Sequence, residues 1–379
     1  MSADLADVFR LHGDSYRKTH KLPLNQLRTM HAIEICRTKE LGGHIDECED
    51  CGHLRISYNS CRNRHCPKCQ FLRKEKWLEE RGRELLPIPY FHVVFTVPEE
   101  INPLALRNQD VVYTILFKAA SETLMELTRT RLGAQIGVIA VLHTWGQNLM
   151  DHPHLHCIVS GGGLSPDGWK SSKRKFFLPV KVMSRLFKGK FLFFLRRAYK
   201  ARRLRFPGTI ALAQGEAAFT VFLEGLYRRE WVVYCKPPFY GPESVIRYLG
   251  RYTHRVALTN RRLVSIEDGK VSFFWKNYAD GNARKTMTLD APEFIRRFLL
   301  HVLPDGFVKI RYFGFLSNRN RKASLVTCRA LLGVGHVPTT PETWQELLLR
   351  LSGVDVTRCP LCHGRLRVKE LPRMYRGPP

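Results

Sequence analysis

The sequence predicts an α+β protein in which a central antiparallel sheet is flanked by helices, with a small cysteine-rich domain ahead of the sheet. Residues 90–97 and 137–144 are rich in aromatic and β-branched side chains, which is typical of strands. Between them, residues 103–132 repeat apolar side chains at helical spacing, so we expect one or two helices lying on the sheet. Two Cys-x-x-Cys pairs near the N-terminus predict the separate small domain.

The other expected elements follow the same patterns along the chain. Residues 1–30 favour short amphipathic helices, and a charged helix over 75–86 leads to a proline-containing joint. The later elements are a strand from His154 that ends in the turn Gly161 to Gly163, a strand at 231–236 ended by Pro237 and Pro238, a helix from Pro242, a hairpin of 261–266 and 270–275, a strand at 287–289 and a helix at 291–303. We therefore expect domains at 1–86, 90–325 and 326–379.

The composition favours a nucleic-acid partner. The chain has 61 Lys and Arg against 34 Asp and Glu, which gives a formal net charge of +27. A surplus of this size suits a polyanion. No run of about twenty apolar residues predicts a transmembrane helix, and the N-terminus lacks the basic and apolar segments of a signal peptide. We expect a cytoplasmic protein without a membrane partner.

Paired cysteines in a basic cytoplasmic chain indicate zinc rather than disulfides. Two Cys-x-x-Cys knuckles can present four thiolates tetrahedrally, and the preferred ligands are Cys48, Cys51, Cys66 and Cys69. Cys61 and His65 are alternatives, which replace one of these four or serve, with Cys36, a second ion. Cys36 is otherwise expected to be a buried small apolar residue.

A third pair, Cys359 and Cys362, stands near the C-terminus with only His363 close in sequence. This pair lacks a full tetrahedral set. It either recruits Cys328 or His336 or holds no metal.

Two basic segments are candidates for DNA contact. The first surrounds the cysteines, with Arg62, Arg64 and Lys68; an ordinary solvated surface is the alternative. The second is residues 170–205, with fourteen Lys or Arg, no acidic residue and interleaved aromatic residues. Basic charge follows a phosphate backbone and exposed aromatic rings stack on unpaired bases, so this segment, with Lys173, Arg174 and Lys175, predicts a single-stranded DNA surface. The alternative is that most of its phenylalanines belong to the core.

The stretch from Asp151 to Gly163 contains a candidate metal site. His154 and His156 flank Leu155, and side chains alternate across a strand, so both imidazoles are expected on one face while Leu155 enters the core. Two neighbouring imidazoles suit one divalent cation. An isolated His-x-His is nevertheless common by chance.

Two tyrosines about ninety residues further on complete the pattern. Pro242 and Glu243 are typical of a first helical turn, so Tyr248 and Tyr252, at i and i+4, are expected on one face. A tyrosine can attack a phosphodiester to form a covalent phosphotyrosine when a metal polarises the phosphate and cations favour the phenolate. Those cations are predicted at Arg247, Arg251 and Arg255. A buried aromatic stripe is the alternative, which the arginines disfavour.

These motifs together resemble the two-tyrosine HUH rolling-circle transposases of bacterial insertion sequences. The resemblance rests on the cysteine-rich module, His154-Leu155-His156 and the tyrosine pair, and it spans roughly residues 20–330. Four further segments are similar to that family in the same order: 60–70, 92–98, 143–147 and 311–319. The resemblance implies an HUH-type palm for the α+β domain and an N-terminal zinc-binding domain.

The resemblance also implies the site and its chemistry. A third polar ligand is expected beside the histidines, with Gln147 favoured over His152, and Asp151 is a candidate to orient an imidazole. Mg²⁺ or Mn²⁺ is the expected ion at this site, with zinc as the alternative. Tyr248 is expected to attack single-stranded DNA first, leaving a 5′-phosphotyrosine and a free 3′-OH, and Tyr252 to act on the target or the other end.

The implied partners are the single-stranded ends of the element and its target, together with host replication or helicase machinery, because no nucleotide-binding loop is present. The expected location is the bacterial cytoplasm, in association with the nucleoid. Two alternatives are a rolling-circle plasmid or phage replication initiator and a non-catalytic zinc-dependent DNA-binding regulator. The oligomeric state, the DNA sequence and the activity of the element are not readable from the sequence.

Overall fold

The computed structural model describes residues 3–173, 177–239, 244–246, 248, 250, 256–277, 280–335 and 342–373. The chain divides into two compact units, each built from separate segments. One comprises Met1–Lys76, His254–Val302 and Val337–Pro379, and the other comprises Trp77–Thr253 and Leu303–His336. The predicted domains at 1–86, 90–325 and 326–379 follow the chain linearly, whereas these units interleave. We call them the cysteine-rich unit and the sheet unit.

An antiparallel sheet forms the centre of the sheet unit, as the sequence predicts. Its strand order is β11-β4-β5-β3-β7, and every neighbouring pair is antiparallel. The strands are β3 (Tyr90–Thr96), β4 (Gln135–Trp145), β5 (Asp151–Ser165), β7 (Val233–Phe239) and β11 (Ile310–Gly314). A short strand, β6 (Gly168–Ser171), pairs with the far end of β5.

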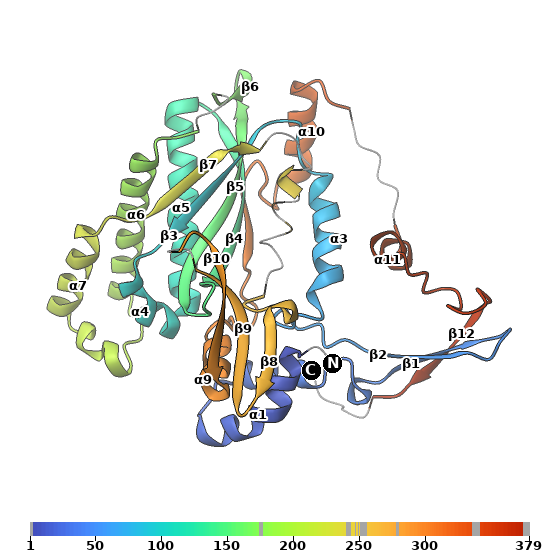
Figure 1. The fold of residues 1–379 in the computed structure, drawn as a ribbon. Helices are drawn as coiled ribbons and strands as arrows, with labels where there is room; N and C mark the ends of the chain where they lie inside the picture. The colour runs from blue at the N-terminus through green and yellow to red at the C-terminus, as the bar shows by residue number, and fades with distance from the viewer. Residues whose placement is uncertain are drawn as a thin grey trace. The chain divides into compact units, whose positions relative to one another are not determined.

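Helices cover both faces of this sheet (Figure 1). On one side lie α4 (Asn102–Arg107), α5 (Gln109–Leu132), α6 (Val180–Lys200) and α7 (Glu216–Arg228), with 3-10 turns at Glu99–Ile101 and Gly208–Gln214. Leu155 and Cys157 of β5 enter the core on this side. On the other side lie the later part of α3 (Gln70–Gly82) and α10 (Arg321–Leu331), and there Tyr90, Ile139 and Ile158 form a second, smaller core. The α+β prediction is confirmed.

The basic aromatic segment divides between core and surface. Phe187 and Phe191 on α6 are fully buried, because they recur one turn apart on the face that packs on the sheet. Phe193 lies on the opposite face and is 61% exposed. Lys173 is exposed just before α6, while Arg174 and Lys175 lie outside the described residues. Among the described aromatic residues of this segment, Phe193 is the exposed one.

Two expected strand ends are wrong. β5 runs through Gly161–Gly163 to Ser165, and these glycines bring neighbouring chains close together. A Cβ at Gly163 would overlap the carbonyl oxygen of Gln135, and one at Gly161 would lie 2.6 Å from the carbonyl oxygen of Pro89. Likewise β7 continues through Pro237 and Pro238 to Phe239. Proline is tolerated there because β7 is the edge strand of the sheet.

The cysteine-rich unit contains two three-stranded antiparallel sheets. One has the order β12-β1-β2, from β1 (Gly43–Cys48), β2 (Leu54–Tyr58) and β12 (Leu366–Leu371). The other has the order β10-β9-β8, from β8 (Leu263–Glu267), β9 (Lys270–Asn277) and β10 (Ala283–Asp290), with the predicted Asp268-Gly269 turn between β8 and β9.

The helices of this unit are α1 (Leu5–Thr19), α2 (Leu24–Glu34), α9 (Ala291–Leu300) and α11 (Trp344–Ser352), with 3-10 turns at Lys39–Leu41 and Asn260–Arg262. Asp4 begins α1 in a capping box with Asp7. The rings of Phe9 and Phe298 meet edge to face at 5.6 Å, which joins α1 to α9. Among the described residues, none of the helices is both long and apolar enough to span a bilayer.

Candidate metal centre and nucleophile

Three adjacent strands bring four histidines to one face of the large sheet. His143 on β4 stands opposite His154 on β5, and Val94 on β3 stands opposite His156. Because directly paired residues project to the same side, and residues two apart do as well, His92, His143, His154 and His156 share a face. Leu155 enters the opposite core, as predicted. The alternation thus separates a polar cluster from the main apolar core.

His143, His154 and His156 form a group that fits one metal ion. Their ligand atoms all lie within 4.8 Å of one another, and the Nε2 atoms of His154 and His156 are 3.1 Å apart. Two nitrogens bound at about 2.1 Å in octahedral or tetrahedral geometry would be about 3.0–3.4 Å apart. The Nδ1 atom of His154 lies 2.6 Å from the carbonyl oxygen of His152, and donates to it. This bond sets the tautomer that leaves Nε2 as the ligand.

His143 was not predicted as a ligand from the sequence. It lies at the end of β4, and the short turn to β5 places it opposite His154. The signal was present in the sequence: two strands joined by a short loop, with a histidine near each facing end. The favoured Gln147 lies in that turn, half-buried, and its role as a ligand stays a prediction. His152 contributes its backbone carbonyl to the site.

His92 was also missed, although its motif was noted. It is 2% exposed, and its Nε2 atom lies 2.9 Å from the Nδ1 atom of His156. The hydroxyl of Tyr248 lies 2.8 Å from Nδ1 and 2.7 Å from Nε2 of His92. Burial, together with the nearby charges of Lys236 and His154, lowers the pKa of His92 to about 3. His92 is therefore neutral at physiological pH and connects Tyr248 to a metal-site histidine.

Tyr248 is helical and 8% exposed, on the sheet face that carries the histidines. The residues around Tyr248 pack closely against α3 at two glycines. Gly82 of α3 faces Ile246, from which a Cβ at Gly82 would lie 2.6 Å, and Gly250 faces Leu78 of α3, from which a Cβ at Gly250 would lie 3.0 Å. The predicted site residues Tyr252, Arg247, Arg251 and Arg255 lie outside the described residues.

Asp151 lies at the start of β5, opposite Trp145, where the register of the β4–β5 pairing shifts. Both carboxylate oxygens are buried without a hydrogen-bond partner, and the side chain of Asn102 donates to the backbone carbonyl of Asp151 at 2.9 Å. Burial raises the pKa of the Asp151 carboxyl to about 7. Neither carboxylate oxygen bonds to an imidazole in this structure, and the role of Asp151 in orienting one stays a prediction.

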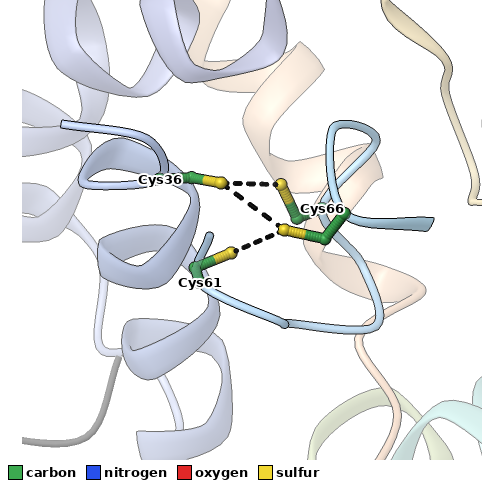
Figure 2. A group of neighbouring side chains, drawn as sticks. Cys36, Cys61 and Cys66 are labelled. Carbon is green, nitrogen blue, oxygen red and sulfur yellow. Dashed lines mark hydrogen bonds between the residues drawn. The ribbon is translucent and has the colours of Figure 1, made fainter. Parts of the chain in front are cut away.

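The cysteines form two groups of four, and neither is the predicted set of Cys48, Cys51, Cys66 and Cys69. The first group is Cys36, Cys61, Cys66 and Cys69. Figure 2 shows Cys36, Cys61 and Cys66 pointing toward one another from separate stretches of the chain. The sulfur of Cys36 lies 3.5 Å from that of Cys69 and 3.6 Å from that of Cys66. These separations match tetrahedral zinc bound by thiolates, for which sulfurs lie about 3.8 Å apart.

The second group is Cys48, Cys51, Cys359 and Cys362. The predicted grouping fails because the two knuckles stand at opposite ends of the β1–β2 hairpin. Cys48 and Cys51 lie in the turn at its tip, whereas Cys66 follows its base. Strands of five or six residues separate them by roughly 16–20 Å. Neither group contains His65.

The basic residues near the first cysteine group differ in their exposure and in their bonding partners. Lys68 forms an ion pair with Asp4. Arg64 is half-buried, Arg62 is exposed, and its carbonyl accepts a hydrogen bond from Arg73 at 3.0 Å. Contact of these residues with DNA stays a prediction.

Two family models match this chain, one over the histidine site and one over the first cysteine group. Residues 137–324 match the family model described as "Putative transposase", and residues 8–97 match the one described as "Transposase zinc-binding domain". The chain is 51% identical over 387 residues to the "Putative transposase y4qJ" of Sinorhizobium fredii (strain NBRC 101917 / NGR234), covering 99% of this chain and 97% of that protein. The chain belongs to the two-tyrosine transposase family of bacterial insertion sequences.

A more distant relative is also described as a transposase. The chain is 26% identical over 350 residues to the "Transposase for insertion sequence element IS801" of Pseudomonas savastanoi pv. phaseolicola, covering 90% of this chain and 82% of that protein. No solved structure matches. The resemblance found in the sequence is confirmed. The transposase zinc-binding match contains every member of the first cysteine group, and ends well before Cys359.

Proposed function

We propose that this transposase cleaves and rejoins single-stranded DNA through a 5′-phosphotyrosine intermediate, with Tyr248 as the first nucleophile. The observation that carries the proposal is the continuous line of contacts from the Tyr248 hydroxyl to His92 and from His92 to His156. A tyrosine buried only for packing has no need of a hydrogen-bonded path to a metal-binding histidine. With a metal ion bound to the three histidines, this path supports a role for the phenol as the attacking group close to that ion.

The three imidazoles are the residues that would hold this ion. When bound, a divalent metal polarises the scissile phosphate and so favours attack at phosphorus. Mg²⁺ prefers an all-oxygen environment, and His143, His154 and His156 offer nitrogen, so the donor set favours Mn²⁺ or another transition-metal ion over Mg²⁺. Water and phosphate oxygens would complete the coordination, since three protein ligands leave open positions.

The chemistry assigned to the chain is a transesterification. The phenolic oxygen of Tyr248 forms a bond to the phosphorus and loses its proton, while the bond from phosphorus to the 3′ oxygen breaks and that oxygen leaves as a 3′-OH. One phosphodiester replaces another, so the bond energy is kept for rejoining. His92 holds the phenol in position by the hydrogen bond at its Nδ1 atom, and burial keeps His92 neutral. Tyr252 would act on the second strand end.

The remaining partners are proposed from charge. The net charge of +27 and exposed cations such as Lys173 suit a DNA strand, and exposed Phe193 offers a ring on which an unpaired base can stack. Strand separation would come from host replication or a helicase. The first cysteine group would hold structural zinc in the domain whose family description names zinc.

The test is cleavage of labelled single-stranded DNA from the element terminus in the presence of Mn²⁺. We expect a protein–DNA adduct that resists SDS, which is lost with His154→Ala and with chelation. Duplex DNA of the same sequence should give little product. If the duplex is cleaved as well as the single strand, the assignment of single-stranded DNA as the substrate is wrong.

A further inference from the structure

The second cysteine group joins two distant segments of the chain. Cys48 ends β1 and Cys51 follows it, whereas Cys359 and Cys362 lie near the C-terminus. Cys362 is 314 positions from Cys48, and Cys359 is 308 positions from Cys51. All four sulfurs lie within 4.8 Å of one another. The Cys359 and Cys362 pair falls outside the residues matched by the transposase zinc-binding model. The group is therefore a site distinct from Cys36, Cys61, Cys66 and Cys69.

The sulfur separations fit a shared metal and not disulfides. The sulfurs of Cys48 and Cys362 are 3.4 Å apart, and those of Cys51 and Cys359 are 3.7 Å apart. A disulfide requires about 2.05 Å. Four thiolates around zinc, each at about 2.3 Å, lie about 3.8 Å from one another. Cys51 and Cys362 are exposed, and surface thiols of this kind would be open to oxidation without such a ligand.

The backbone around the group is shaped like two facing zinc knuckles. The amide of Gly52 donates to the carbonyl of Cys48 at 3.0 Å, and the amide of His363 donates to the carbonyl of Cys359 at 3.0 Å, so each pair closes the same tight turn. The two turns touch: the amide of Glu49 donates to the carbonyl of Arg365 at 3.0 Å.

Gly364 lies at this contact between the two turns. A Cβ there would overlap the carboxylate of Asp50. A larger residue at this position would have to displace the exposed side chain of Asp50.

The neighbouring sheet keeps the two segments in register. β12 pairs with β1 along its whole length, from Gly43 opposite Leu371 to Cys48 opposite Leu366. In Figure 1 the red β12 lies beside the blue β1. Lys369 and Glu47 form an ion pair across this junction at 2.6 Å. The pairing of β12 with β1 therefore brings the C-terminal cysteines to the tip of the β1–β2 hairpin, and this pairing does not depend on the sulfurs.

We propose that Cys48, Cys51, Cys359 and Cys362 bind a second structural zinc ion, which fastens the C-terminal segment to the β1–β2 hairpin. Neutral thiols would lose their protons on binding, and the tetrahedral set of four sulfurs is closed, with no position left for a substrate. The site is a clamp and takes no part in DNA cleavage. It explains why the cysteine-rich unit includes residues from both ends of the described chain.

The zinc content of the full-length protein tests this proposal. The measurements use a His154→Ala background, so that zinc at the histidine site does not add to the count. We expect about two zinc ions per chain by mass spectrometry of the metal content. Cys359→Ser with Cys362→Ser should lower this to about one, as should Cys66→Ser with Cys69→Ser. Cys157→Ser and Cys235→Ser, which change cysteines outside both groups, should leave the zinc content at two ions per chain.

Two further measurements keep the test independent of misfolding. Cys362→His should retain the second ion, because imidazole replaces thiolate in tetrahedral zinc sites. In the zinc-loaded protein, the exposed Cys51 and Cys362 should react slowly with an alkylating agent, and chelation should accelerate both together. The proposal fails if the Cys359 and Cys362 variant keeps two zinc ions, if these thiols react rapidly in the loaded protein, or if the purified protein shows the colour of an iron–sulfur cluster.

Discussion

Replacing His92 by phenylalanine tests how the nucleophile is positioned. Phenylalanine keeps a flat ring at a position that is 2% exposed, but removes the contacts of Nε2 to His156 at 2.9 Å and of Nδ1 to Tyr248 at 2.8 Å. Loss of an outer-shell partner of a metal ligand lowers metal affinity about 10–100-fold, or about 1.4–2.7 kcal/mol. A displacement of the nucleophile by about 1 Å lowers the rate by about 100-fold.

The loss of metal affinity and the displacement of the nucleophile can be measured separately. Mn²⁺ affinity is measured by titration calorimetry, and the single-turnover rate of adduct formation is measured at saturating Mn²⁺, where the loss of affinity no longer contributes. His92→Gln retains a donor and an acceptor and should recover part of both. His301→Phe, at another buried histidine outside the site, controls for the substitution itself. A correctly folded His92→Phe with wild-type affinity and rate would show that His92 only fills space.

Three further predictions concern the frame around the site. Gly163→Ala should destabilise the fold by about 1–3 kcal/mol or more in chemical denaturation, because its Cβ meets backbone, whereas Gly189→Ala, in a helix with open space, should stabilise it by about 0.5–1 kcal/mol. Phe187→Ala should cost about 3–5 kcal/mol of stability, whereas Phe193→Ala should leave stability nearly unchanged and weaken single-stranded DNA binding by about 1–3 kcal/mol, measured by fluorescence anisotropy. Because burial raises the pKa of Asp151 to about 7, above its unfolded value, the folded protein holds this proton more tightly and its stability falls as pH rises from about 4 to about 7. Asp151→Asn should therefore raise the melting temperature at pH 8 and change it little at pH 4; an equal gain at both would contradict this.

The large sheet was predictable because its strands carry a strong local signal. The β-branched and aromatic runs at 90–97 and 137–144 match β3 and β4 within two residues, and the long amphipathic run became α4 and α5. The strand ends were less predictable. Gly161 to Gly163 and Pro237-Pro238 are ordinary break signals, but close strand packing requires the glycines, and an edge position accommodates the prolines.

The site was predictable to the extent that it is local in sequence. His154 and His156 lie two residues apart, so strand alternation alone places them together. His143 and His92 come from neighbouring strands, and only the register between strands reveals their place. Tyr248 was found by its spacing from Tyr252, but its bond to His92 spans 156 positions and leaves no local pattern.

The cysteine groups show the limit more clearly. The Cys-x-x-Cys spacing correctly identified the cysteine pairs, but it did not show which pairs come together in one group. Cys359 meets its partners beside β1 because β12 pairs with β1. The polar, basic sequence of β12 does not predict this long-range pairing. Cys36, expected to be a buried apolar residue, is indeed buried, yet its sulfur contacts two other cysteines.

The most direct test of the account is to identify the residue that becomes joined to DNA. Arg247, Arg251 and Arg255 place the two tyrosines on separate tryptic peptides, Tyr248–Arg251 and Tyr252–Arg255. After a single turnover on a strand from the element terminus, nuclease and trypsin digestion followed by mass spectrometry should find the 5′-phosphonucleotide on the first peptide. Tyr248→Phe should remove it. Modification of the second peptide alone would overturn the assignment of Tyr248 as the first nucleophile, and modification of neither would contradict cleavage through phosphotyrosine.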